Sequence, residues 1–401
     1  MAIATGRTAD VDVVLRDGST VRVREGRPDD APEVLAFFEG LSDDSRYSRF
    51  FTTAVDLDDM AQRALDQRDG RLALLATTGA PPRVVGLGEL VPVDDEHAEV
   101  AFTVADAVQG RGLATILLAH LAEAATAAGI LTLQAETLSA NREMLGVFTT
   151  SGLPFTVVSE GRIATVEAPA ALSRAAIAAF ESRAASATAR AVAAVLAPAS
   201  VAVVGASDRP GSVGGRVLAN IVDGGYTGRV HVVNRRAGQV GGLPAVPTLA
   251  AIGAPVELVV VAVPASAVVD VARDAAAAGA RALVVLSAEF AETGEQGAER
   301  QRELLAVCRE AGMRLVGPNC LGVLDTDPAV RLNATFATTV PQPGGAALMS
   351  QSGAVAIALL DRAATRGLGI SSFVSAGNKA DLSGNDLLQF WEQDARTRVI
   401  L

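Results

Sequence analysis

Two glycine-rich turns in this 401-residue chain have a composition that suits phosphate binding. The first is "VQGRGLAT" at 108–115 and the second is "VVGASDRPGSVGG" at 203–215. Each turn lies between a strand-like apolar run and a helix-like run. A helix N-terminus presents unpaired backbone N–H groups and the positive end of the helix dipole, and small residues there let a pyrophosphate approach the backbone. The sequence therefore predicts two sites for a phosphate-bearing molecule.

A carboxylate lies on the strand-like run that leads into the first turn, "HAEVAFTVA" at 97–105. Alternation places Glu99 on one face of this strand, among small neighbours, and the large apolar residues on the other. An amine acceptor must lose a proton before it attacks, because a free lysine amine has a pKa of about 10.4. Burial would raise the pKa of Glu99 and make it a better base. Glu89 is the competing base, a solvated strand charge is the alternative for either, and His97 is expected at the surface.

The elements that position these residues alternate between strand and helix from about residue 20 to residue 168. Period-two apolar patterns predict strands at 19–25, 71–78, 82–92, 98–105 and 130–137. Helices are predicted at 27–41, 43–51, 114–129 and 141–152. Residues 169–197 are rich in alanine, which favours helix, so they predict a helical connector, with a semi-rigid linker as the alternative.

From residue 198 the pattern changes to strand–helix–strand units. Near-continuous apolar runs predict strands at 200–206, 229–234, 257–264 and 282–288. Strands of this kind are buried on both faces of a parallel sheet, so the fold class is α/β. A further unit begins near residue 331, and the chain ends on the strand-like run "TRVIL", which indicates a fragment of a longer protein.

The composition excludes several classes of protein. The net charge is −11 and no block of Lys and Arg is present, which argues against nucleic acid as the main partner. No apolar run reaches the roughly 20 residues of a membrane helix, and the N-terminus lacks the apolar core of a secretory signal. Cys308 and Cys320 are too few for a disulfide framework or a zinc cluster, so no metal is expected. These features predict a cytoplasmic protein.

The first turn reads Gln109-x-x-Gly112-x-Ala114, and with its flanking elements it resembles the GNAT acetyltransferase family. The resemblance covers residues 20–168 and implies an N-terminal GNAT α+β domain whose turn amides bind the pyrophosphate of acetyl-CoA. It also implies that Glu99 is the catalytic base for acetylation of lysine. The cofactor-binding residues expected here are Val104, Gln109, Gly110, Arg111, Gly112, Ala114, Thr115 and Asn141. For Asn141, a plain helix N-cap is an equal alternative.

The second turn does not fit the G-x-G-x-x-G spacing of a nicotinamide site. Asn234 and Arg235 follow the next strand at the place where such a site has an acidic residue. Arginine there suits an extra phosphate, such as the 3′-phosphate of coenzyme A or the 2′-phosphate of NADP.

Six ordered motifs in the second half resemble the α-type part of NDP-forming acyl-CoA synthetases, relatives of succinyl-CoA synthetase. They are "VVGAS…GSVG", "VAVPA", "RLVGPNCLG", "LNATFA", "SQSGAVA" and "FVSAGNKADLSGNDLLQFW". The resemblance implies a Rossmann-like CoA-binding domain at 198–330 and the start of a succinyl-CoA synthetase-like, flavodoxin-type domain at 331–401. The CoA-binding residues expected are Gly205, Ala206, Ser207, Ser212, Val213, Gly214, Asn234, Arg235 and Pro264.

The second half also departs from that family. Glu289 replaces a family glycine and would crowd the acyl site, the family's phosphohistidine would lie beyond Leu401, and no ATP-grasp domain is present. Ligase activity of this chain alone is therefore not expected. Cys320 is expected to be a packing residue, whereas Ser350 and Ser352 either cap a helix or hold a phosphate.

The fusion of the two resemblances is similar to bacterial protein lysine acetyltransferases that act on metabolic enzymes, AMP-forming acetyl-CoA synthetase among them. The implied function is acetyl transfer to a lysine amine, with the second region binding CoA or acyl-CoA as a regulatory module. The alternatives are an NDP-forming acyl-CoA synthetase (acetate–CoA ligase) part with an accessory GNAT domain, a CoA-sensing protein, and a GNAT acting on a small amine. Lys379 is the only lysine in the chain, so it and the N-terminus are the main positions for self-acetylation.

Overall fold

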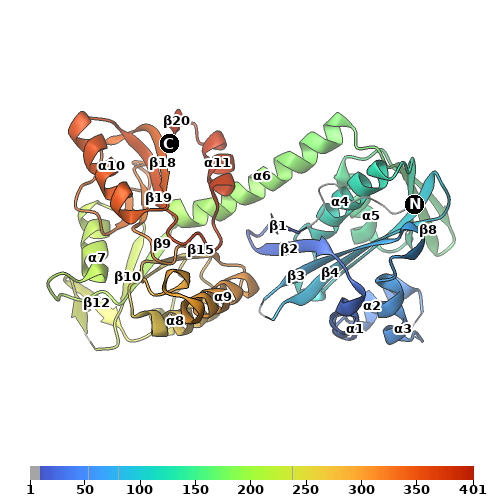
Figure 1. Ribbon diagram of the computed structural model, residues 1–401, viewed down its shortest axis with the longest axis horizontal. Helices are drawn as coiled ribbons and strands as arrows, with labels where there is room; N and C mark the ends of the chain where they lie inside the picture. The colour runs from blue at the N-terminus through green and yellow to red at the C-terminus, as the bar shows by residue number, and fades with distance from the viewer. Residues whose placement is uncertain (1–9, 53, 80, 237) are drawn as a thin grey trace. The chain divides into compact units, whose positions relative to one another are not determined.

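The computed structural model describes residues 10–52, 54–79, 81–236 and 238–401 (Figure 1). Residues 1–9, on which the prediction about a secretory signal partly rests, lie outside the described residues. The chain forms two compact units that meet within helix α6 (Arg174–Leu196), so the predicted connector is a single helix. Within the described ranges, no helix combines the length and apolar character needed to cross a membrane.

The first unit is built on an eight-stranded sheet with the order β1-β2-β3-β4-β5-β6-β8-β7. Its strands are β1 (Val11–Val14), β2 (Thr20–Glu25), β3 (Leu72–Thr78), β4 (Arg83–Pro92), β5 (His97–Val104), β6 (Thr132–Leu138), β7 (Thr156–Glu160) and β8 (Ile163–Pro169). β5 and β6 are parallel, and their pairing stops at Glu99↔Gln134, although both strands continue. The two strands therefore diverge and leave a gap in the sheet.

Helices cover both faces of this sheet (Figure 1). One face carries α1 (Ala31–Glu39), α2 (Asp43–Phe50) and α3 (Leu57–Ala64), and the other carries α4 (Leu113–Ala127) and α5 (Arg142–Ser151). Gly86 on β4 allows α4 to pack closely, since a Cβ there would come within 2.7 Å of Leu113. The sequence prediction omitted β1 and α3, which have 4 and 8 residues.

The second unit contains a seven-stranded sheet with the order β11-β12-β10-β9-β13-β14-β15. Its strands are β9 (Ser200–Val204), β10 (Arg229–Val233), β11 (Gln239–Val240), β12 (Leu243–Val246), β13 (Leu258–Val261), β14 (Ala282–Val285) and β15 (Arg314–Val316). All pairings except β11–β12 are parallel, and β9, β13 and β14 are fully buried, which confirms the α/β prediction. Helices α7 (Val213–Asp223), α8 (Ala265–Ala277) and α9 (Glu295–Glu310) connect the strands.

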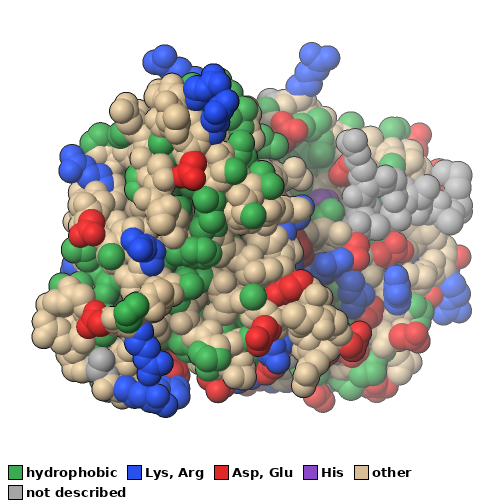
Figure 2. Space-filling model, turned by 60° about the vertical axis from the view of Figure 1, so that its left-hand side comes forward, with side chains coloured by type: hydrophobic (Ala, Val, Ile, Leu, Met, Phe, Trp, Pro, Cys, Tyr) green, Lys and Arg blue, Asp and Glu red, His purple; other side chains and the backbone are tan. Residues whose placement is uncertain are grey.

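A five-stranded sheet, in the order β17-β16-β19-β18-β20, follows in the same unit. It comprises β16 (Gly322–Asp325), β17 (Leu332–Thr335), β18 (Pro343–Ser350), β19 (Ile370–Ser375) and β20 (Val399–Ile400), with helices α10 (Gly353–Arg366) and α11 (Gly384–Gln393). β16 pairs with β17 and β19, so the residues of this sheet begin at Gly322. Exposed apolar side chains lie between charged ones on the face drawn in Figure 2. Val355 and Leu359 of α10 are among the exposed apolar residues of this unit.

A buried ion pair joins the two sheets of the second unit. The Arg314 Nε on β15 donates to the Asp381 carboxylate at 2.8 Å, and the two side chains are only 4% and 5% exposed. The Leu315 N–H also donates to Asp381, at 2.9 Å. Asp386 on α11 lies 3.4 Å from the same guanidinium. A buried charge of this kind is tolerated because it is paired and hydrogen bonded.

Candidate functional site

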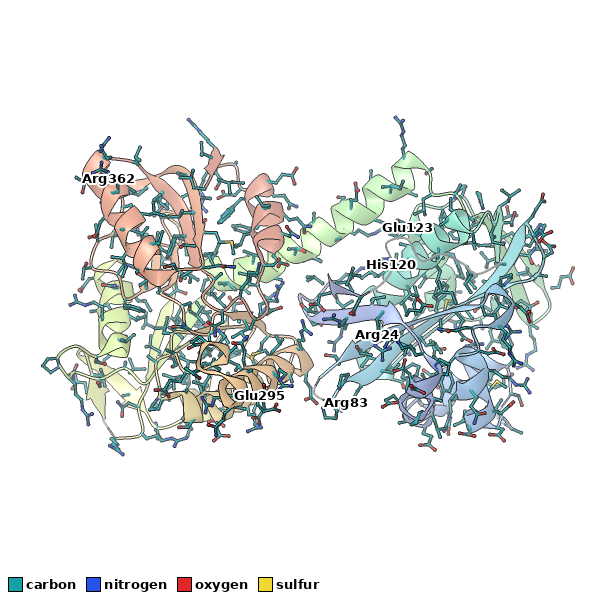
Figure 3. The ribbon with its side chains drawn as sticks, in the orientation of Figure 1. Arg24, Arg83, His120, Glu123, Glu295 and Arg362 are labelled. Atoms are coloured by element: carbon teal, nitrogen blue, oxygen red, sulfur yellow. The ribbon has the colours of Figure 1, made fainter. Side chains whose placement is uncertain are left out.

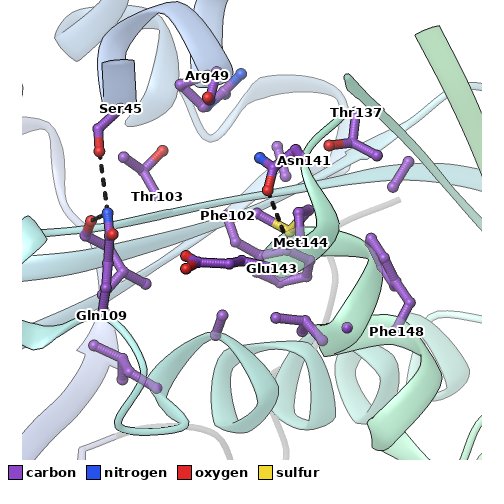
Figure 4. A pocket seen from close by; sticks show the side chains of 18 of the residues that line it. Ser45, Arg49, Phe102, Thr103, Gln109, Thr137, Asn141, Glu143, Met144 and Phe148 are labelled. Carbon is purple, nitrogen blue, oxygen red and sulfur yellow. Dashed lines mark hydrogen bonds between the residues drawn. The ribbon is translucent and has the colours of Figure 1, made fainter. Parts of the chain in front are cut away.

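A cavity of about 580 Å³ opens in the first unit at the gap between β5 and β6 (Figure 4). Its walls come from the diverging ends of these strands, the turn before α4, helix α2 and helix α5. Of the first-half residues predicted from the sequence, seven cofactor residues and the proposed base line it: Val104, Gln109, Gly110, Gly112, Ala114, Thr115, Asn141 and Glu99. The fold thus brings the phosphate turn and the carboxylate into one site.

The turn before α4 has the backbone conformation that its glycines predict. Gly110 and Gly112 have φ angles of 74° and 89°, a left-handed region that residues with a Cβ avoid. The Ile116 N–H donates to the Gly112 carbonyl at 3.2 Å, so the amides of Leu113 and Ala114 belong to the first turn of the helix. Such amides have no partner within the helix and are available to an anion.

Arg111 does not line the cavity, and its role as a cofactor contact stays a prediction. Its guanidinium instead donates to the Ala107 carbonyl at 2.7 Å, because the side chain folds back over the preceding turn. Arg16 lines the cavity in its place, and its N–H donates to the Arg111 carbonyl at 3.0 Å. Arg16 lies on the loop between β1 and β2, far from the turn in sequence, and no local pattern marked it.

The alternation predicted for β5 is confirmed. Phe102 packs with α4 and α5 in one hydrophobic core, whereas Thr103 is opposite Leu87, which belongs to the core under α1 and α3. Glu99 therefore faces the side of the sheet that α2 covers. Glu99 is exposed, because it stands at the last paired position of β5 and β6, where the sheet opens.

Glu89 is the weaker of the two base candidates in this geometry. Its side chain is 13% exposed and accepts an ion-pair hydrogen bond from Arg49 Nη2 at 2.5 Å. Arg49 lines the cavity, whereas Glu89 does not. His97 is half-exposed and contacts Asp94, with Nδ1 and Oδ1 2.8 Å apart, and this hydrogen bond raises the pKa of His97.

Two polar residues of the wall were not predicted. Thr103 is 5% exposed, and its hydroxyl has no hydrogen-bond partner within the described residues. Ser45 on α2 accepts a hydrogen bond from Gln109 Nε2 at 3.1 Å, and the same amide donates to the Val104 carbonyl at 3.1 Å (Figure 4). Gln109 therefore connects α2 and β5 to the phosphate turn.

Helix α5 supplies the opposite wall. Asn141 caps this helix, with its Oδ1 accepting from the Met144 N–H at 3.0 Å, and it lines the cavity as well, so both of its predicted roles are compatible. Phe148 meets Phe102 edge to face with ring centroids 6.2 Å apart. Phe102 and Phe148 thus form an apolar patch that suits an acyl or pantetheine chain, although Glu143 of α5 also lines the cavity.

In the second unit, the residues predicted around coenzyme A gather at the carboxyl ends of β9, β10 and β13. Gly205 has φ 91°, and a Cβ there would come within 2.4 Å of the Ala262 carbonyl, so only glycine fits. A Cβ on Gly214 would come within 2.8 Å of the Gly205 carbonyl. Asn234 Nδ2 donates to the Ala206 carbonyl at 2.7 Å. The strand order reverses beside β9, which is where open α/β sheets bind ligands.

A second cavity, of about 480 Å³, adjoins this edge but includes only three of the predicted residues: Ser207, Ser212 and Val213. Ser207 donates to Ser212 at 3.1 Å, and Ser212 caps α7 by accepting from the Gly215 N–H. Arg209 and Arg216, which the sequence did not single out, line the cavity too. Gly205, Ala206, Gly214, Asn234, Arg235 and Pro264 lie outside it.

Arg235 is exposed, and Pro264 stands at the N-cap of α8. Cys320 is buried, with its thiol 3.2 Å from the Val285 carbonyl, and burial raises its pKa to about 12, as expected of a packing residue. Ser352 caps α10, accepting from the Val355 N–H at 3.4 Å, and Ser350 donates to the Ser352 carbonyl at 3.0 Å. Glu289 is exposed and has a left-handed φ of 74°.

Comparisons with known proteins identify the class of each unit. Residues 36–153 match the acetyltransferase (GNAT) family, residues 199–326 match a CoA binding domain, and residues 343–401 match the succinyl-CoA ligase like flavodoxin domain. Both units thus come from families of enzymes that use coenzyme A or acetyl-CoA. Among the described residues, no group of three or more His, Cys, Asp or Glu side chains could hold a metal ion.

Three known proteins illustrate these matches. The α subunit of acetate–CoA ligase (ADP-forming) I from Pyrococcus furiosus is 39% identical over 208 residues, which cover 51% of this chain and 45% of that protein. The dinucleotide-forming acetyl-coenzyme A synthetase 1 of Ca. Korarchaeum cryptofilum is 40% identical, with a TM-score of 0.49, over 51% of this chain and 43% of that one. The GNAT domain of S. lividans PAT is 35% identical, with a TM-score of 0.37, over 40% of this chain and 96% of that one.

The chain is therefore a fusion of a GNAT-family acetyltransferase domain with a CoA binding domain and a succinyl-CoA ligase like flavodoxin domain, and this second part is similar to ADP-forming acetate–CoA ligase. It spans less than half the length of the ligase relatives named above.

Proposed function

We propose that the first unit transfers an acetyl group from acetyl-CoA to a lysine amine. The observation that carries this proposal is the cavity at the β5–β6 gap, because the glycine turn at the start of α4 and the Glu99 carboxylate open onto the same space. The turn amides and Arg16 would hold the pyrophosphate of the donor. The apolar wall of Phe102 and Phe148 would hold the uncharged part of the donor.

The chemistry follows from this placement. Glu99 takes a proton from the acceptor ammonium, directly or through one water, which gives a neutral amine. The amine nitrogen then attacks the thioester carbonyl, the new C–N bond forms, and the C–S bond breaks. The coenzyme A thiolate leaves and takes up the proton that the nitrogen loses as the amide forms. The exposure of Glu99 is compatible with return of its proton to solvent between turnovers.

For the acceptor, we propose a lysine on a metabolic enzyme, with AMP-forming acetyl-CoA synthetase as the first to test. The support is the fusion itself, which is similar to bacterial protein lysine acetyltransferases. In this proposal the second unit binds CoA or acyl-CoA and regulates transfer. Such a ligand acts only if it binds the active and inactive arrangements with different affinity.

A second function has a specific observation in its favour. Over about half of the chain, the second unit is 39% identical to a subunit of an ADP-forming acetate–CoA ligase. This identity favours a ligase part, with the GNAT domain accessory to it, over a purely regulatory module. The proposal is tested by incubating the chain with acetate, CoA and ATP and measuring acetyl-CoA and ADP. Formation of both would establish ligase chemistry, whereas CoA binding without turnover would show that this chain alone is not a ligase.

The acetyltransferase proposal is tested by mixing the protein, acetyl-CoA and AMP-forming acetyl-CoA synthetase and mapping acetyl-lysine by mass spectrometry. We expect site-specific acetylation that falls by about 10²-fold in Glu99→Gln, the lower range for loss of a general base. The matched control is Glu123→Gln, an exposed glutamate on α4 outside the cavity (Figure 3). Equal activity of Glu99→Gln and the wild type would contradict the role of Glu99 as the base. Absence of acetyl-lysine, with acetyl-CoA still bound, would contradict AMP-forming acetyl-CoA synthetase as the acceptor.

A further inference from the structure

The charged residues that line the first cavity are two arginines and four carboxylates: Arg16, Arg49, Asp44, Glu99, Glu136 and Glu143, the last of these on α5. Arg16 lies beside the turn before α4, where the donor phosphates are proposed to bind. Three carboxylates lie on the acceptor side: Asp44 on α2, Glu99 on β5 and Glu136 on β6. All three side chains are exposed and line the cavity.

The topology places these three carboxylates around one gap. Glu99 stands opposite Gln134 at the last paired position of β5 and β6. Glu136 is two residues further along β6, so it lies on the same face of the sheet as Gln134, across the opening from β5. Helix α2 contacts both strands on this face and carries Asp44. The acceptor side is thus bordered by a carboxylate from each of its three elements.

The cation on this wall is already neutralised. Arg49 lines the cavity, but its guanidinium is paired with Glu89 at 2.5 Å. Asp44, Glu99 and Glu136, in contrast, have no ion-pair partner among the residues that the structure describes. The acceptor side therefore presents a net negative charge to an incoming molecule.

A buried hydroxyl on the same face also indicates a bound molecule. Thr103 lies on the Glu99 face of β5, further into the cavity wall, and is 5% exposed. Its Oγ1 has no partner within the described residues. A buried hydroxyl without a hydrogen bond is unfavourable, so a ligand atom or a water held with the ligand is expected beside it.

We infer that the acceptor is a positively charged amine in a basic surrounding, such as a lysine flanked by arginines, and that Asp44, Glu99 and Glu136 select it over neutral or acidic amines. This inference rests on the proposed acetyltransferase function. Charge complementarity at an exposed rim acts mainly on encounter and is weakened by salt. The selection is therefore expected in kcat/KM at low ionic strength.

The test uses the whole chain, acetyl-CoA and short peptides with one central lysine flanked by arginine, serine or glutamate. Thiol release gives kcat/KM for each peptide. We expect the arginine-flanked peptide to exceed the glutamate-flanked one by about tenfold. The ratio should fall to about two in a variant carrying Asp44→Asn and Glu136→Gln, and in wild type at high salt. Glu123→Gln is the control in which the ratio should persist.

The possible outcomes distinguish failure of the charge selection from failure of the proposed acetyltransferase function. Transfer to all three peptides at similar kcat/KM, or a ratio unchanged in the double variant, overturns the charge selection and leaves the acetyltransferase in place. Absence of transfer to every peptide, with acetyl-CoA still bound, overturns lysine acetylation itself and the selection with it.

Discussion

The Asp106 carboxylate accepts a hydrogen bond from the Ser45 hydroxyl at 2.7 Å. Two further bonds, from the N–H and the hydroxyl of Ser42, reach Asp106 at 2.9 and 2.8 Å. Ser42 caps α2, and Asp106 lies just before the phosphate turn. Helix α2, which borders the acceptor side, is therefore hydrogen bonded to the segment that leads into the phosphate turn.

Asp106→Asn should loosen this attachment, because an amide cannot accept as many hydrogen bonds as a carboxylate. We expect the KM for the acceptor peptide to rise by about fivefold and the Kd for acetyl-CoA to change by less than about twofold, since single charge-assisted hydrogen bonds contribute modestly. Asp106→Glu, which keeps the carboxylate, should recover part of the loss. Equal effects of both variants on both constants would indicate a general structural role.

The pH dependence of this attachment has a definite sign. Hydrogen bonds from Ser45 and then Ser42 lower the pKa of Asp106. A lowered pKa means that the carboxylate contributes at any pH above its usual value of about 3.9 and that the contribution is lost as the pH falls through the lowered value. The acceptor KM should therefore be insensitive to Asp106 near neutral pH, and a rise between pH 8 and 6 that Asp106→Asn abolishes would contradict this assignment.

Gly112→Val should abolish tight acetyl-CoA binding. The residue has φ 89°, and a Cβ would come within 3.1 Å of Arg16 Nε. A left-handed conformation costs a residue with a Cβ roughly 1–2 kcal/mol, so the turn should rearrange and the Kd should rise by more than about tenfold. Isothermal titration calorimetry measures the effect. Gly129→Val is the matched control, with φ 87° and open space around its Cβ, and it should bind acetyl-CoA normally.

Thr103→Val should separate stability from ligand recognition. Valine has the shape of threonine but removes a buried hydroxyl that has no partner within the described residues. The unliganded protein should lose no stability and could gain up to about 1 kcal/mol in its free energy of unfolding. The acceptor kcat/KM should fall several-fold. A clear loss of stability by urea unfolding would show that the hydroxyl is satisfied within the folded protein, for instance by water.

Asp381→Ala should destabilise the second unit strongly, because it leaves the buried Arg314 without its main partner. Breaking a buried pair in this way costs about 3–5 kcal/mol. The free energy from urea unfolding, followed by a probe in the second unit, gives the measurement. Asp270→Ala removes one of the two partners of Arg273, in an exposed pair whose side chains are 52% and 70% accessible, and should cost less than about 1 kcal/mol. Similar costs for the two variants would contradict the role of burial.

The first site could be predicted from the sequence to the extent that its signals are local. The alternation around Glu99 determines which residues share a face, since strand geometry has a period of two. The glycines at 110 and 112 mark a turn that needs left-handed backbone. The near-continuous apolar runs of β9, β13 and β14 likewise indicate a parallel sheet buried on both faces.

What only the tertiary structure decided depends on contacts between distant segments. Arg49 pairs with Glu89 across 40 residues, which removes Glu89 from the cavity. Arg16 lines the cavity beside the phosphate turn, and Glu99 is exposed because β5 and β6 separate just beyond it. Local periodicity determines the face of the sheet toward which a side chain points. Packing of the whole sheet determines where a strand loses its neighbour and which helix covers it. Charge pairing and exposure therefore follow only from the folded chain.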